Sequence, residues 1–142
     1  MNSDLDILNE IHKGLVMGME SISVISEKVG DGNFKDDLDY QYKQYGEILD
    51  NVNSVFEQNE KKADDTNTMQ KVMGWTNIKM STINDKSNSH ISKMLIKGNV
   101  MGIIEGVKLL NRNPDCNKQT KDILNNFIKT QENNIEKLKT YL

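Results

Sequence analysis

A six-residue segment occurs twice in the chain and constrains the fold more than any other feature. Residues 13–18 read Lys-Gly-Leu-Val-Met-Gly, and residues 97–102, 84 positions later, read Lys-Gly-Asn-Val-Met-Gly. Both copies lie in long stretches with helical periodicity, although each glycine costs roughly 1 kcal/mol relative to alanine inside a helix. The glycines recur at the same positions in both copies despite this cost. The repeat therefore predicts a chain built from two related helical halves.

Apolar residues recur with a period close to 3.6 over four long segments, which indicates amphipathic helices. The first helix is expected to begin near the N-cap Ser3 and to stop at Gly30, a natural left-handed cap. The second should begin at about Phe34, and Ser87 or Ser89 should cap the third. The residues expected on the buried faces are, in chain order, Leu5, Leu8, His12, Leu15, Val16, Met19, Ile22 and Ile25, widened by Ile7 and Ile11; Leu38, Tyr42, Tyr45, Leu49, Val52 and Phe56; Ile91, Met94, Leu95, Val100, Ile103, Ile104, Val107 and Leu110; and Ile123, Leu124, Phe127, Ile128, Ile135, Leu138 and Leu142.

The connections between these segments differ in length. Residues 59–68 are polar and predict a long connection, which continues into a shorter helix over 69–83 that contains Trp75. Residues 111–117, with the only proline, separate the last two helices. A weaker repeat relates residues 35–38 to residues 121–124, two positions out of the first register. These features predict one all-α domain over residues 1–142, a four-helix bundle of two hairpins joined by a crossover connection.

Composition excludes several classes of function. The net charge is −3 and Arg112 is the only arginine, so bidentate phosphate or base recognition has little to work with. Cys116 is the only cysteine, which rules out an intramolecular disulfide and fits a reducing cytoplasm. No apolar stretch is long enough to span a bilayer, and no signal peptide is evident. We therefore expect a cytoplasmic protein that binds neither nucleic acid nor membranes.

Three short segments resemble a known superfamily. They are Gly18-Met19-Glu20, the pair Gly74-Trp75, and residues 89–98, which read Ser-His-Ile-Ser-Lys-Met-Leu-Ile-Lys-Gly. With the helical pattern, they make the chain similar to the ferritin-like superfamily, and more narrowly to bacterial ferritin-like domains of unknown function. The resemblance implies a ferritin-like bundle. In the di-iron members of that superfamily, two helices each supply one Glu and the other two each supply a Glu-x-x-His pair.

The chain departs from this ligand pattern. The expected pairs are replaced by Gln-Tyr-Lys-Gln at residues 41–44 and by Gln-Glu-Asn-Asn at residues 131–134. Glu20 and Glu105 occupy roughly corresponding places on the first and third long helices. Two carboxylates without imidazole partners make a poor site for a transition metal. We therefore predict no catalytic, cofactor-binding or metal-ligating residues; the alternative is a degenerate site built from Glu20, Glu105, Gln131 and possibly Glu132.

The repeated glycines allow two interpretations. Gly14, Gly18, Gly98 and Gly102 remove side chains from a patch of each helix, so that the first and third long helices could approach closely. The same glycines could instead leave a pocket for a small apolar ligand. Tight packing is the favoured interpretation, because empty volume in a core is costly.

The remaining polar and sulfur-containing residues have structural interpretations. His12 is expected to be a partly buried structural histidine, His90 to lie near the surface, and Cys116 to be a spectator thiol. The methionines are expected to fill the core. Three tyrosines, Tyr40, Tyr42 and Tyr45, surround the ligand position of the second helix.

Together these residues favour a non-enzymatic cytoplasmic bundle that acts through protein contacts, as a homo-oligomer associating through the Trp75 helix. Two alternatives stay open. One is an atypical metal-binding or oxidative-stress protein with a carboxylate and amide site, and the other is a binder of a small hydrophobic ligand.

Overall fold

The computed structural model describes residues 3–63 and 85–142, and within these ranges the chain forms four α-helices and no β-strand. The helices are α1 (Asp4–Ser26), α2 (Gly32–Gln58), α4 (Asn88–Arg112) and α5 (Lys118–Lys139). The predicted all-α class is confirmed. None of the described helices is long and apolar enough to cross a membrane. The short helix predicted over residues 69–83, with Trp75, falls outside the described ranges.

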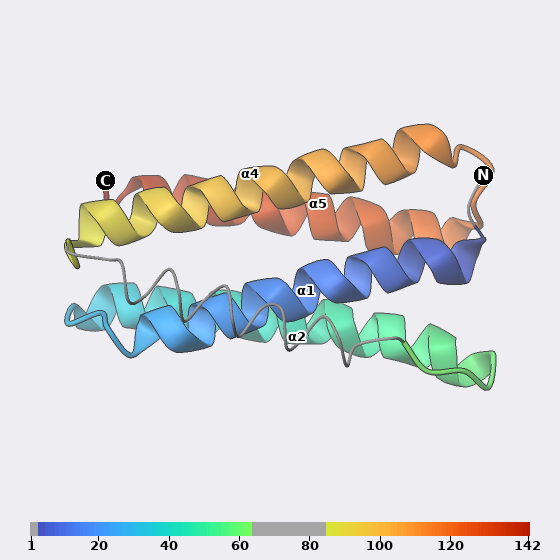
Figure 1. The fold of residues 1–142 in the computed structure, drawn as a ribbon, viewed down its shortest axis with the longest axis horizontal. Helices are drawn as coiled ribbons and strands as arrows, with labels where there is room; N and C mark the ends of the chain where they lie inside the picture. The colour runs from blue at the N-terminus through green and yellow to red at the C-terminus, as the bar shows by residue number, and fades with distance from the viewer. Residues whose placement is uncertain (1–2, 64–84) are drawn as a thin grey trace.

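The four helices form a bundle of two antiparallel hairpins, α1 with α2 and α4 with α5 (Figure 1). Helix α2 ends at the opposite end of the bundle from the start of α4, so these two helices run in the same direction (Figure 1). The hairpins also pack against each other, through α2 with α5 and through α1 with α4 and α5. The prediction of two helical hairpins is confirmed, whereas most of the predicted connection between them lies outside the described residues.

The helix caps repeat with the same spacing as the sequence. The Ser3 side chain caps α1 by accepting from the Asp6 amide, and the Ser87 side chain caps α4, 84 residues later, by accepting from the His90 amide. Asp31 caps α2, and Asn117 caps α5 86 residues later. The two-residue difference lies in α4, which has 25 residues against 23 in α1. Each hairpin therefore has the same plan, with one helix lengthened by two residues.

Two predicted boundaries of the first hairpin were wrong. Gly30 is not a left-handed cap, because no glycine among the described residues has a positive φ. Helix α1 ends at Ser26, and the Lys28 and Val29 amides then donate to carbonyls three residues earlier, which continues a right-handed turn. Helix α2 begins two residues before Phe34, because the Asp31 carboxylate accepts hydrogen bonds from the Asn33 and Phe34 amides.

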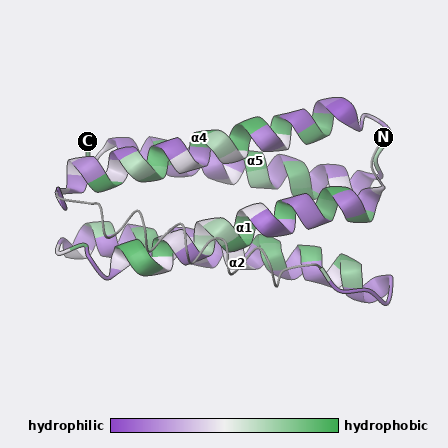
Figure 2. Ribbon diagram, in the orientation of Figure 1, coloured by the Kyte–Doolittle hydropathy of each residue, from purple (hydrophilic) through white to green (hydrophobic). Residues whose placement is uncertain are grey.

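Hydrophobic and hydrophilic bands alternate along each helix, as amphipathic helices require (Figure 2). The predicted core of α1 and α5 is largely confirmed, although Leu142 is exposed. In α2, Tyr42 is exposed and Gln41 is buried in its place. In the second half of α4 the prediction was wrong for Val100, Ile104 and Val107, which are exposed. The buried residues of α4 are Ile91, Ser92, Leu95, Asn99 and Gly106.

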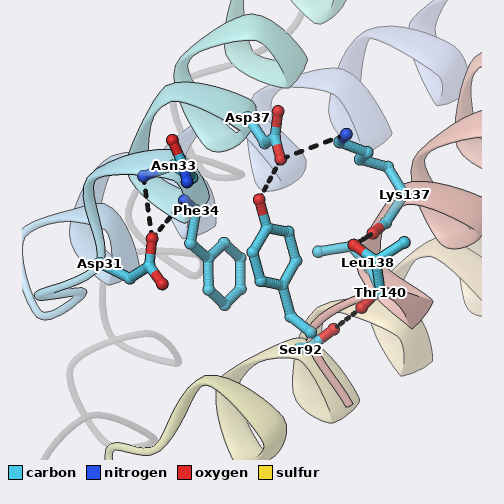
Figure 3. Close-up of polar contacts among 9 residues, drawn as sticks. Asp31, Asn33, Phe34, Asp37, Ser92, Lys137, Leu138 and Thr140 are labelled. Carbon is cyan, nitrogen blue, oxygen red and sulfur yellow. Dashed lines mark hydrogen bonds and ion pairs between the residues drawn. The ribbon is translucent and has the colours of Figure 1, made fainter.

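A cluster at one end of the bundle ties the two hairpins together (Figure 3). The rings of Phe34 and Tyr141 stack with their centroids 4.1 Å apart, and the Tyr141 hydroxyl donates to Asp37. Lys137 lies 3.7 Å from the same carboxylate, and the Ser92 hydroxyl donates to the Leu138 carbonyl. Because these contacts join α2 and α4 to the end of α5, they hold the C-terminus of the described chain against both hairpins.

Candidate functional site

A layer of polar side chains crosses the middle of the core, where a helical bundle usually packs apolar residues. The Tyr45 hydroxyl donates to Asn99 Oδ1 at 2.8 Å, and Asn134 Nδ2 donates to the Tyr45 hydroxyl oxygen at 3.2 Å. Asn99 Nδ2 donates in turn to the Leu95 carbonyl at 2.8 Å. Together with Gln41 and Gln131, which are also buried, these residues make up what we call the central polar layer.

The two glutamines of the central polar layer are less well satisfied than its other members. Gln41 is 2% exposed and Gln131 is 5% exposed. Neither amide nitrogen has a hydrogen-bond partner among the described residues. A buried donor without a partner costs about 1–3 kcal/mol. The layer therefore combines a hydrogen-bonded centre of Tyr45, Asn99 and Asn134 with two buried glutamines whose amide nitrogens have no partner among the described residues.

Burial controls the ionisation of the tyrosine at the centre of the layer. Burial raises the pKa of Tyr45 to about 12, and the hydrogen bond from Asn134 opposes this shift only in part. The phenol is therefore neutral at physiological pH and acts as a hydrogen-bond donor and acceptor. A neutral phenol is a weak metal ligand, because transition metals in proteins favour anionic or imidazole donors.

Three of the four repeated glycines are notches, positions where the missing side chain leaves room for a large side chain of another helix. A Cβ added at Gly18 would lie 3.0 Å from the Tyr45 ring, and one added at Gly102 would lie 2.6 Å from Gln131 Cδ. A Cβ at Gly14 would lie 3.1 Å from the Phe127 ring, whereas one at Gly98 would meet nothing within 4 Å.

The prediction that these glycines bring the first and third long helices into close contact was wrong. Each of the three inward glycines instead faces a side chain of α2 or α5. The space that they leave is filled, so they do not form a ligand pocket either.

The carboxylates of the alternative metal site are not brought together. Glu105 is exposed and pairs with Lys108 at 3.3 Å on the surface of α4. Glu20 is half-buried and is not among the residues that α1 buries, and Glu132 is exposed. Gln131 alone of the four points into the core. No group of three or more His, Cys, Asp or Glu side chains with the geometry to hold a metal ion occurs within the described ranges.

The two histidines, the cysteine and two of the methionines lie as follows. His12 is buried on α1, as expected for a structural histidine, and His90 is half-buried in the first turn of α4. Cys116 is a free, half-buried thiol. Met17 and Met101 are exposed, so the prediction that the methionines fill the core was wrong for both.

A surface groove lies between α2 and α5, away from the repeated glycines. Its volume is about 570 Å³, and its apolar lining residues are Ile48 and Ile123. The other lining residues are polar or charged: Asn51, Ser54, Lys118, Gln119, Asp122 and Asn126. Binding sites for hydrophobic molecules are enclosed and mostly apolar, so the groove does not suit such a ligand.

The apolar residues that α4 leaves exposed lie on one side of the helix. They are Val100, Met101, Ile104 and Val107, with exposed fractions of 42, 67, 49 and 39%. Spacings of three and four residues place them on one face of a helix. We call them, with the flanking exposed Lys93, Lys97 and Lys108, the α4 outer face.

The orientation of α4 follows from the notches. Gly102 and Gly106 must face α5, because a Cβ at Gly106 would lie 2.7 Å from Ile128 Cγ1. The apolar residues between these glycines then point outward. The repeat could have revealed this, since the 84-residue offset aligns Asn99 with the buried Leu15 and Val107 with the exposed Ser23.

Comparison of the chain with known protein families, with curated proteins and with solved structures gave no match.

Proposed function

We propose that the protein is a ferritin-like bundle without a di-metal centre, which acts in the cytoplasm through contacts with other proteins. The observation that carries the proposal is the pair Gln131 and Asn134. The two residues are three apart on α5 and buried, in the arrangement that a Glu-x-x-His pair has in a di-iron bundle. They supply amide groups instead of a carboxylate and an imidazole.

The residues of the central polar layer do not fit a di-metal centre. Asn99 and Asn134 each form a hydrogen bond with the Tyr45 hydroxyl, and Gln131 occupies the notch at Gly102. A di-iron site in a bundle needs carboxylates that converge from facing helices, and the buried polar residues of the described core include none. Metal chemistry at this place would need a different set of side chains, so we derive no reaction for the protein.

The exposed residues of α4 support a role in binding. Apolar residues scattered singly on a surface are ordinary, whereas a contiguous apolar patch with a polar rim marks an interaction site. Val100, Met101, Ile104 and Val107 form such a patch, and lysines border it. We therefore assign a structural role to the interior of the bundle and a role in binding other proteins to the α4 outer face.

Metal loading tests the absence of a di-metal centre. Protein purified without chelator would be loaded anaerobically with Fe²⁺ or Mn²⁺, desalted and submitted to elemental analysis. We expect metal far below one equivalent per chain. Tightly held metal at one equivalent or more, lost in Glu20→Gln or Glu105→Gln, would overturn the proposal in favour of the degenerate carboxylate site.

A further inference from the structure

Charge is divided unequally between the two hairpins. Residues 3–63 contain 13 acidic and six basic side chains, whereas residues 85–142 contain six acidic and ten basic side chains. The nearly neutral balance of the whole chain therefore hides an acidic first hairpin and a basic second hairpin. Such a distribution favours contact between the first hairpin of one molecule and the second hairpin of another.

The contrast is sharpest between α4 and α2. Helix α4 has four basic residues and one acidic residue, Glu105, whereas α2 has six acidic and two basic residues. The exposed side chains of α2 include Asp36, Tyr40, Glu47 and Asp50, which recur at helical spacing and share one side of the helix. We call these four the α2 outer face; its aromatic residue, Tyr40, is 63% exposed.

The two faces have matching patterns. Lys97 and Lys108 are 11 residues apart, and so are Asp36 and Glu47. Eleven residues correspond to about 16 Å along a helix. Between the two lysines lie Met101, Ile104 and Glu105, and between the two acids lie Tyr40 and Lys43. An apolar centre with two flanking cations can therefore meet an aromatic centre with two flanking carboxylates.

We infer that the α4 outer face binds the α2 outer face of a second copy of this chain, in a head-to-tail arrangement. The inference rests on the proposed function, because it names the partner of the bundle's exposed surface. A symmetric pairing of α4 with α4 is disfavoured, since it would set Lys93, Lys97 and Lys108 against the same three lysines. Each face also has one charge of the other sign, Glu105 on α4 and Lys43 on α2, and these are too few to reverse the attraction.

A head-to-tail contact leaves one face free at each end, so association continues until the chain of molecules closes into a ring or grows open-ended. The expected result for the wild-type protein is a sedimentation coefficient that rises with concentration at low salt. It should fall toward that of the monomer at high salt, because the contact includes exposed charge pairs that salt screens. Wild-type protein that stays monomeric at low salt and sub-millimolar concentration would overturn the inference.

Mixing two variants tests the geometry of the contact. Ile104→Asp disrupts the α4 outer face and keeps the α2 outer face, whereas Tyr40→Lys does the opposite. Each variant alone should be monomeric, with the circular dichroism and melting temperature of the wild type. An equimolar mixture should form a one-to-one dimer and nothing larger, because only one intact pair of faces remains.

The controls separate the failure of this inference from the failure of the proposed function. Ser23→Asp, at the position on α1 that the repeat aligns with Val107, should leave association unchanged. Lys97→Glu with Lys108→Glu should abolish association, and mixing this variant with Asp36→Lys plus Glu47→Lys should restore it. If Tyr40→Lys still self-associates, or if the mixture stays monomeric, the head-to-tail inference is wrong. Only stoichiometric metal in the loading experiment would reject the metal-free bundle itself.

Discussion

The two hairpins have the same backbone arrangement but differ in the side chains at corresponding positions. Their N-caps correspond, with Ser3 matching Ser87 and Asp31 matching Asn117, and each has a glycine notch filled by its own partner helix. In the first hairpin the notch at Gly18 receives the Tyr45 ring, and in the second the notch at Gly102 receives the Gln131 amide. A repeated motif therefore preserves the backbone plan while the chemistry of the core diverges.

The outer faces diverge as well. The 84-residue offset aligns the exposed Ile104 and Val107 of α4 with Glu20 and Ser23 of α1. At these two positions the first hairpin has polar residues and the second has exposed apolar ones. Helix α4 therefore has a larger exposed apolar patch than α1.

The largest expected effect on the free energy of unfolding comes from a comparison of substitutions at corresponding core positions of α5 and α2. Phe127 fills the notch at Gly14, and the 86-residue offset aligns it with Gln41. Phe127→Ala should lower the free energy of unfolding by about 3–5 kcal/mol through lost burial and a cavity. Gln41→Leu should change it by less than about 1 kcal/mol, because the substitution removes a buried donor that has no partner. Urea denaturation measures both, and equal losses would contradict the asymmetry.

The second prediction concerns alkaline pH. Because the pKa of Tyr45 is raised to about 12 in the folded protein, the neutral phenol is favoured there, and its contribution is complete below the unfolded-state pKa of about 10. This contribution should be lost as pH rises from 10 to 12, by about 2–3 kcal/mol in total.

The measurement compares wild-type protein with Tyr45→Phe across that pH range. The difference between the two proteins isolates the contribution of Tyr45 from that of every side chain that both proteins share. Parallel curves for the two proteins above pH 10 would show that Tyr45 is accessible to water.

The third prediction concerns a substitution that makes the second hairpin resemble the first at one core position. Asn99→Leu introduces the residue that the first copy of the repeat has at Leu15. It should cost about 1–3 kcal/mol, because the buried Tyr45 hydroxyl loses its acceptor. The cost should shrink in a Tyr45→Phe background, with a coupling of about 0.5–3 kcal/mol in a double-mutant cycle. Additive effects would mean that the hydrogen bond contributes nothing to stability.

The sequence was sufficient for features that depend on local chemistry. Ser3 was predicted as the cap of α1, and Ser87 was one of two serines predicted to cap α4, because an N-cap is recognised from the side chain and the few residues after it. The amide character of residues 131 and 134 was also evident, since their identities alone exclude a Glu-x-x-His pair. The confirmed bundle likewise follows from periodicity and connection lengths.

The features that were missed depend on packing between helices. Helix α4 has apolar residues on both sides, so periodicity alone could not decide which side is buried. Gly102 and Gly106 settle the question, because only glycine leaves room for Gln131 and Ile128. The partners of Tyr45 are 54 and 89 residues away, a relation that no local pattern contains. The start of α2 was also missed, because the Asp31 side chain caps this helix. Gly30 does not adopt the left-handed conformation that was predicted for it.

The claim that the inward glycines of α4 are side-chain notches can be tested most directly with one pair of variants in that helix. Gly98 and Gly106 lie two turns apart in the same helix, and the substitution to alanine is chemically the same. Gly98 faces open space, so Gly98→Ala should stabilise the protein by about 0.5–1 kcal/mol through helix propensity. Gly106→Ala should destabilise it by about 1–3 kcal/mol, because a Cβ there would lie 2.7 Å from Cγ1 of the buried, branched Ile128 side chain. Opposite signs in urea denaturation are the predicted result, and equal stabilisation by both variants would contradict the account.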